Sequence, residues 1–97
     1  MNEPLVLQGP EGSITLVPGA LTQLVVAAAE GVEGAKVRRP KRSVHVEHGA
    51  VSLGIAVAHG ASVPGVAREV QERVAAAVSA TCGLEVEAVD VLVEAVV

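Results

Sequence analysis

Three histidines and a single cysteine are the side chains in this sequence best suited to binding a metal ion or attacking a substrate. His45 and His48 have opposite parity in one alternating stretch, so a strand would point them to opposite faces, and His59 falls in a separate loop. Cys82 precedes a glycine that ends a predicted helix, where the helix dipole disfavours a thiolate. No ligand spacing links these residues to the acids. We therefore expect no metal site and no cysteine nucleophile.

Carboxylates and serines are the remaining residues that could catalyse a reaction. The acids near the end of the chain fall on the outward side of a predicted strand, where charges usually guard an edge against aggregation. They are Glu85, Glu87, Asp90 and Glu94. The serines have no local nucleophile motif such as Gly-x-Ser-x-Gly. With no candidate catalytic or cofactor-binding residue, the sequence predicts a protein that is not an enzyme and has neither a cofactor nor a small-molecule substrate.

Positive charge is concentrated in one short segment. The formal net charge is −4, yet five of the seven basic residues fall within residues 36–42. The rest of the chain has two basic residues and eleven acidic ones. The candidate contacts for an anion or a partner are Lys36, Arg38, Arg39, Lys41 and Arg42. Such a cluster could bind RNA phosphates or anionic lipid headgroups. The alternative is a solvated loop that balances an acidic body, which we favour because the chain has no aromatic residue to stack on bases.

A second pattern associated with nucleic acids lies just before the basic segment. Residues 31–34 (Gly-Val-Glu-Gly) have the Gly-x-x-Gly spacing with which KH domains clamp a nucleic-acid backbone. Glu33 would repel phosphate, and glycines commonly end helices. We therefore interpret these glycines as a helix terminator and regard nucleic acid as the less favoured partner.

A single small domain has to position all of these residues. The 97 residues fit one domain over 1–97, with a core of about 12–94. Hydrophobic residues make up 51% of the chain and aromatic residues 0%, so aliphatic side chains must fill the core, and the abundant valines favour strands. No apolar run is long enough to cross a bilayer, and no secretory signal is recognisable. The lone cysteine suits a reducing cytoplasm, where we expect the protein to reside.

Hydrophobic periodicity predicts the elements of the first half of the chain. Alternation over Ser13–Val17 indicates a half-buried strand. Pro18 suits the first position of a helix, which Gly31 or Gly34 can end in the left-handed conformation. Residues 44–57 alternate on both sides of a glycine and predict a β-hairpin.

The second half predicts another helix and a final strand. The helix runs from Val63 to Gly83, with Val70 in its apolar stripe. The strand after it changes phase, because its apolar residues switch parity, and this indicates a β-bulge or bend near Ala88 and Val89. The order strand-helix-strand-strand-helix-strand predicts an α+β fold with two helices packed on one face of a mostly antiparallel sheet.

The end of the last strand is a candidate surface for self-association. Leu92 is predicted to point outward between Asp90 and Glu94, and the sequence then reads Ala-Val-Val. Exposed apolar patches of this kind often mark contacts between chains. The candidate residues are Leu92, Val96 and Val97. The alternative is that the apolar stretch Leu5–Leu7 of the same chain covers Leu92.

The order of several motifs resembles one known family. Residues 12–16 (Gly-Ser-Ile-Thr-Leu) lead into a helix that ends at 28–34 (Ala-Ala-Glu-Gly-Val-Glu-Gly). A hairpin precedes residues 63–67 (Val-Pro-Gly-Val-Ala), and residues 81–86 (Thr-Cys-Gly-Leu-Glu-Val) and 89–93 (Val-Asp-Val-Leu-Val) close the pattern. Over residues 12 to 94 the chain resembles the alkaline shock protein family of bacterial envelope-stress proteins.

This resemblance implies a non-enzymatic function. Members of the family are cytoplasmic proteins that self-associate and are held at the inner face of the membrane by an integral, membrane-anchored protein partner. We therefore expect a structural or interaction protein that forms a homo-oligomer. The alternative, from a different class, is a small RNA-binding module that uses the basic loop 36–42.

Overall fold

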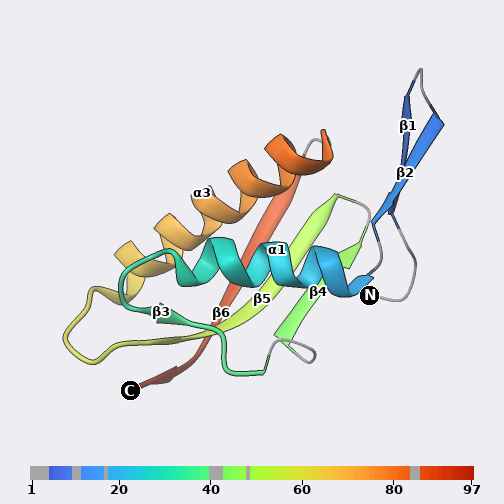
Figure 1. The fold of residues 1–97 in the computed structure, drawn as a ribbon. Helices are drawn as coiled ribbons and strands as arrows, with labels where there is room; N and C mark the ends of the chain where they lie inside the picture. The colour runs from blue at the N-terminus through green and yellow to red at the C-terminus, as the bar shows by residue number, and fades with distance from the viewer. Residues whose placement is uncertain (1–4, 10–11, 17, 40–42, 48, 84–85) are drawn as a thin grey trace.

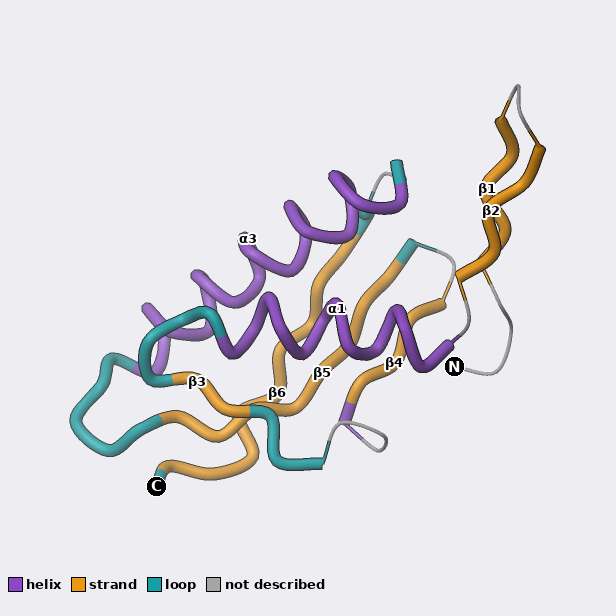
Figure 2. Tube along the Cα trace, in the orientation of Figure 1, coloured by secondary structure: helices purple, strands orange, loops and turns teal. Residues whose placement is uncertain are grey.

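A computed structural model describes residues 5–9, 12–16, 18–39, 43–47, 49–83 and 86–97. The chain forms two helices and two separate sheets, shown as a ribbon in Figure 1 and as a tube in Figure 2. The elements in chain order are β1 (Leu5–Gly9), β2 (Gly12–Leu16), α1 (Pro18–Glu30), β3 (Ala35–Lys36), β4 (Val44–Glu47), β5 (Ala50–Val57), α3 (Val63–Cys82) and β6 (Ala88–Val96).

The larger sheet has four strands with β5 at its centre. β6 pairs in parallel with the whole length of β5. β3 and β4 therefore share the other side of β5, where both pair antiparallel with it, β3 near the end of β5 and β4 near its beginning. The β5–β6 pair is parallel because α3 carries the chain back between them. Both helices lie on one face of this sheet (Figure 1), which confirms the predicted α+β class with a mostly antiparallel sheet.

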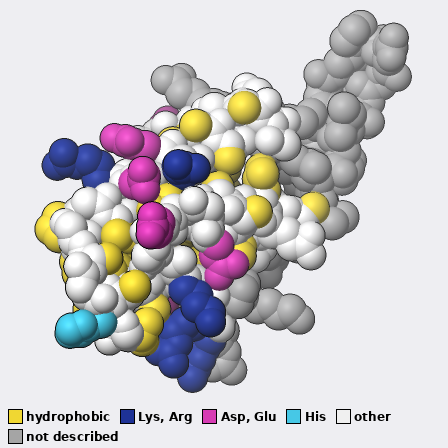
Figure 3. Space-filling model, turned by 60° about the vertical axis from the view of Figure 1, so that its left-hand side comes forward, with side chains coloured by type: hydrophobic (Ala, Val, Ile, Leu, Met, Phe, Trp, Pro, Cys, Tyr) yellow, Lys and Arg dark blue, Asp and Glu magenta, His cyan; other side chains and the backbone are white. Residues whose placement is uncertain are grey.

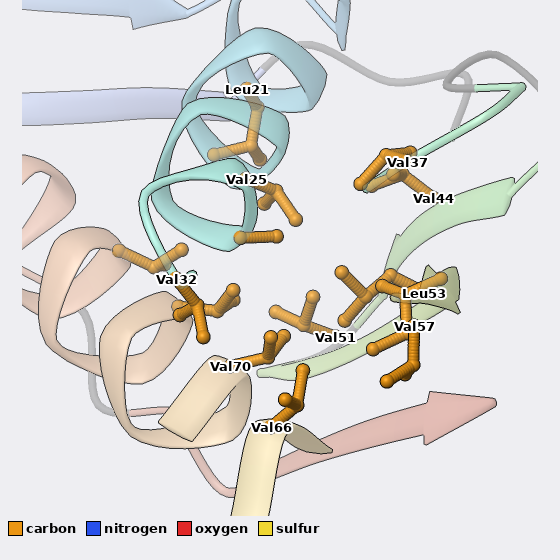
Figure 4. Packing of buried hydrophobic residues seen from close by; sticks show 14 residues of the cluster. Leu21, Val25, Val32, Val37, Val44, Val51, Leu53, Val57, Val66 and Val70 are labelled. Atoms are coloured by element: carbon orange, nitrogen blue, oxygen red, sulfur yellow. The ribbon is translucent and has the colours of Figure 1, made fainter. Parts of the chain in front are cut away.

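The core lies between the helices and β5. Alternate residues of β5 point toward the helices and are almost fully buried, while Ser52 on the opposite face is exposed. Figure 4 shows valine side chains from both helices directed toward those of β5. The buried residues are Leu21, Val25, Ala29, Val32, Val37, Val44, Val51, Leu53, Ile55, Ala56, Val57, Val66, Val70, Val74 and Val78. Val70 is 0% exposed, as its place in the apolar stripe predicts.

Local signals set the limits of the helices. α1 begins at Pro18, as predicted, and ends at Glu30, directly before Gly31. The predicted left-handed cap at the end of this helix is wrong, because Gly31 has no positive φ and Gly34, with φ 91°, lies in the turn that leads into β3. α3 is capped by Ser62, whose hydroxyl accepts a hydrogen bond from the Gly65 N–H at 3.2 Å. Gly83 ends α3 with φ 66°, and its N–H donates to the Ser79 carbonyl at 2.9 Å.

The strand predicted over 13–17 forms but does not join the main sheet. β2 pairs only with β1, from Leu5 opposite Leu16 to Gly9 opposite Gly12, and the resulting hairpin stands away from the body (Figure 1). The sequence pattern identified the strand but could not identify its partner, and the strands β1 and β3 were not predicted.

The predicted bulge near Ala88 and Val89 is wrong. β6 begins at Ala88, and the residues just before it, Val86 and Glu87, lie outside any strand, so the phase change falls at the strand start. The actual irregularity lies between Ile55, which pairs with Val93, and the next β5 residue, which pairs with Ala95. Glu94 is therefore the extra residue of the strand.

Candidate protein-interaction surface

β6 has one side without a partner in the described part of the chain, because it pairs only with β5. Leu92 is 66% exposed, Val96 54% and Val97 61%. These side chains and the unpaired backbone side of β6 form what we call the β6 edge. The alternative that Leu5–Leu7 covers Leu92 is wrong, because β1 pairs with β2 and Leu92 faces solvent.

The β6 edge is firmly attached to the body. Val91 and Val93 are half-buried against the core. The Gln71 side chain of α3 donates from Nε2 to the Val89 carbonyl at 2.9 Å. Beyond the strand, the Val97 N–H donates to the Val57 carbonyl at 2.9 Å. A partner would therefore meet a pre-ordered strand, which lowers the entropic cost of binding.

No sequence pattern indicates the contact that Gln71 makes with β6. A glutamine on the polar side of an amphipathic helix is usually read as a solvated residue. Only the position of α3 over β6 brings its amide to a backbone carbonyl of the strand.

The sequence predicted that the acidic residues of the last strand guard its edge against aggregation. Glu94 does not do so. Its side chain lies across the helix-free face of the sheet, where its Oε1 accepts a hydrogen bond from the Ser43 hydroxyl at 3.3 Å. A Cβ atom on Gly54 of β5 would lie 2.6 Å from the Glu94 Cδ. Because this carboxylate folds over β5 toward Ser43, it is drawn away from the open side of β6.

The rest of the helix-free face is polar. The register aligns His45 of β4, Ser52 of β5 and Asp90 of β6 in one row, and all three are exposed. Lys36 of β3 lies further along the same face, opposite Ala56. Ala56 itself is 1% exposed, so this part of the face is covered by its neighbours, whereas the row of His45, Ser52 and Asp90 is open to solvent. Among the described residues, the large hydrophobic side chains that are exposed lie on the β6 edge and at Val6 of the hairpin.

The basic segment projects into solvent where the structure describes it. Lys36, Arg38 and Arg39 are exposed. Figure 3 shows one larger group of Lys and Arg side chains at the bottom of the view, with others in separate places on the same face. Between them Val37 is 5% exposed, and its N–H donates to the Glu30 Oε2 at 3.1 Å, so the segment is anchored at this point. The remaining two candidate residues, Lys41 and Arg42, lie outside the described residues.

The Gly-x-x-Gly segment is part of the core packing. Val32, between the two glycines, is 2% exposed. A Cβ atom on Gly34 would lie 3.3 Å from the Ala61 Cβ and 3.4 Å from the Val66 Cγ2. A loop with one variable residue buried cannot lay both of its variable positions along a phosphate backbone, so these residues act as the turn that joins α1 to β3.

The residues with metal-binding or nucleophilic side chains are dispersed. His45 lies on β4 and His59 in the loop after β5, while His48 and the Cys82 side chain lie outside what the structure describes. Across the described ranges, no three His, Cys, Asp or Glu residues come close enough to hold a metal ion. Within the same ranges no helix is long and apolar enough to span a bilayer.

The fold and this surface define a small α+β domain in which two helices cover one face of a four-stranded sheet and one sheet edge is left open. Residues 15–97 match the model of the alkaline shock protein 23 family, which is described as having a cell envelope-related function. The match covers most of the chain, so the chain belongs to this family, as its motifs indicated. No curated protein and no solved structure matches the chain.

Proposed function

We propose that this chain is a non-enzymatic structural protein of the cell envelope that acts by binding copies of itself and a membrane-anchored protein partner. Membership of the family supports the envelope-related setting. The observation that carries the proposal is the β6 edge, where Leu92 is 66% exposed beside a row of unpaired backbone groups.

An open strand edge in water leaves backbone groups and apolar side chains available to another chain. An open strand is a template for pairing with another chain, and proteins that stay monomeric usually place charges or a covering segment along it. Here Asp90 is the exposed charge that remains on the strand, because the carboxylate of Glu94 is drawn onto the sheet face by Ser43, and no described segment covers the strand. Pairing would satisfy the free N–H and C=O groups and would remove Leu92 and Val96 from water.

The chemistry of the body supports a protein partner as the link to the membrane. The formal net charge of −4 disfavours direct binding of the whole molecule to an anionic leaflet. The exposed basic residues Lys36, Arg38 and Arg39 could contribute a local contact at the inner face once a partner has brought the protein there. We therefore place the protein at the cytoplasmic side of the membrane through its partner.

RNA binding by the basic loop is the less favoured function. The glycine pair that could have clamped a backbone belongs to the core packing, and the chain offers no aromatic ring for stacking. The chain contains no Trp or Tyr, so copurifying nucleic acid would dominate its ultraviolet absorbance and be easily seen. Absorbance of that kind, lost in high salt, would support the RNA-binding function.

Self-association through the β6 edge can be tested with a variant that combines Leu92→Lys with deletion of Val96 and Val97. Light scattering with refractive-index detection, needed because the chain lacks Trp and Tyr, should show the wild type as an oligomer and the variant as a monomer. The circular dichroism spectrum should remain close to native, because the side chains are exposed and the deletion removes only the last residue of β6 and the backbone hydrogen bonds of Val97 with Val57 and His59. A matched control is Ala76→Lys on the exposed side of α3, which should leave the mass unchanged. A wild type that is monomeric at about 100 μM would contradict the proposal.

A further inference from the structure

The β1–β2 hairpin is a second incomplete piece of sheet in this molecule. Its strands pair only with each other, and it stands away from the helices and the main sheet (Figures 1 and 2). The register sets Leu5 opposite Leu16 and Leu7 opposite Ile14, so four large aliphatic residues share one parity, while Val6 lies in the other parity opposite Thr15. A two-stranded hairpin alone is marginally stable in water and usually needs a third strand or another surface.

The hairpin and the β6 edge carry all the large hydrophobic residues that are exposed in the described part of the chain. These are Val6 of β1, 46% exposed, together with Leu92, Val96 and Val97. Scattered exposed aliphatic residues need no explanation, but here they concentrate on two strands that both lack a neighbour. The hairpin and the β6 edge each have a free strand edge and exposed apolar residues, so each could supply the neighbouring strand that the other lacks.

The two pieces cannot meet within one chain. β2 ends at Leu16 and α1 begins at Pro18, so a single residue joins the hairpin to the helix. The start of α1 lies near β4, on the side of β5 that is opposite to β6 (Figure 1). The hairpin is therefore held at one edge of the sheet, and the β6 edge faces away from it at the other.

We propose that the β1–β2 hairpin of one copy adds to the β6 edge of a second copy and extends its four-stranded sheet. This inference rests on the proposed self-association and identifies its two contact surfaces. It is a form of strand addition, in which backbone hydrogen bonds supply affinity and alternating side chains supply register. The partner of the β6 edge is thus a different surface of the same protein.

Charge favours this arrangement over a direct contact between two β6 strands. Direct pairing of two β6 strands would bring the exposed carboxylates of Asp90 from both copies to one interface, which is unfavourable for like charges. The residues of β1 and β2 carry no charge and so avoid this repulsion.

Because donor and acceptor are different surfaces, they can be disabled separately. The donor variant combines Leu7→Asp with Ile14→Asp, two residues paired in the hairpin register. The acceptor variant combines Leu92→Asp with Val96→Asp, both at exposed positions. A matched control combines Ala76→Asp with Ala80→Asp, which adds the same charge to the exposed side of α3.

Light scattering should find the wild type and the control as oligomers, and the donor and acceptor variants as single chains. An equimolar mixture of the two variants should recover the mass of two chains, because one supplies an intact hairpin and the other an intact β6 edge. A second donor variant, Thr15→Pro, interrupts the hairpin without adding charge and should behave like the first. Circular dichroism should confirm the native fold of every variant.

Three outcomes would overturn the inference. If both donor variants keep the mass of the wild type, self-association stands but the hairpin is not part of it. If the mixed variants, each natively folded, remain single chains, the two surfaces do not bind each other. If the wild type is itself a single chain, this inference and the proposed self-association both fail.

Discussion

The carboxylate of Glu94 lies over the backbone of Gly54, in the space that any other residue at position 54 would fill with its side chain. A Cβ atom on Gly54 would approach the Glu94 Cδ to 2.6 Å and its Cγ to 3.1 Å. The same carboxylate accepts a hydrogen bond from Ser43 at 3.3 Å, so one side chain connects β6, across β5, to the start of β4. The glycine in the middle of β5 is thus explained by space rather than by backbone conformation.

A double-mutant cycle tests this relationship. Gly54→Ala should stabilise the Glu94→Ala variant by about 0.5–1 kcal/mol, because glycine is unfavourable inside a strand. In the wild type the same change should lose this gain, because it displaces Glu94 and breaks a hydrogen bond worth about 0.5–1.5 kcal/mol. Urea unfolding followed by circular dichroism measures both differences.

The matched control for this cycle is Ser52→Ala, two residues earlier on the same face of β5. Its effect should be the same with and without Glu94. Equal effects of Gly54→Ala in the two backgrounds would show that Glu94 does not occupy this space in solution.

Val70→Asp should abolish most of the stability of the domain. Val70 is 0% exposed, and an unpaired carboxylate there costs several kcal/mol against a total of about 5–15 kcal/mol. Thermal melting by circular dichroism should show a large loss, whereas Ala76→Asp on the exposed side of α3 should have little effect. A Val70→Asp protein that melts within a few degrees of the wild type would mean that this side of α3 does not face the sheet.

Binding to acidic vesicles distinguishes the two interpretations of the basic segment: a segment that contacts anionic surfaces should bind such vesicles at low salt, and a solvated loop should not. Changing Arg38, Arg39, Lys41 and Arg42 together to Ser should abolish sedimentation with vesicles that contain anionic lipid. Binding by the wild type should weaken at physiological salt, because exposed charges are screened over about 8 Å. The control is a variant with Arg68 and Arg73 of α3 changed to Ser, which should bind as the wild type does. Absence of wild-type binding at low salt would establish the segment as a solvated loop.

The parts of the fold that sequence could predict are those set by local pattern. Apolar alternation predicted β5 with its buried face, and Pro18 and Gly83 marked helix limits that the structure confirms. The choice of strand partners was not predictable, because alternation is the same whether a strand joins the main sheet or, as β2 does, forms a separate hairpin. The bulge at Glu94 also left no trace, since exposure keeps alternating through it.

The candidate surface also has features that local sequence predicts and contacts that it does not predict. The outward position of Leu92 follows from its parity beside Val91 and Val93, and the structure confirms it. The contacts of Glu94 with Gly54 and Ser43 join residues far apart in sequence. They arise only when β4, β5 and β6 have assembled, and no local pattern encodes them.

The composition of the core has a consequence for how it acquires a unique arrangement. Ten of the fifteen buried core residues are valines, and among the described residues no buried polar or charged side chain accompanies them. Neither ring geometry nor side-chain hydrogen bonds can then select one packing over another. A valine, however, has a single side-chain torsion, which its branched Cβ already restricts. The core of this protein is therefore ordered by side chains that have little rotational freedom to give up when they are buried.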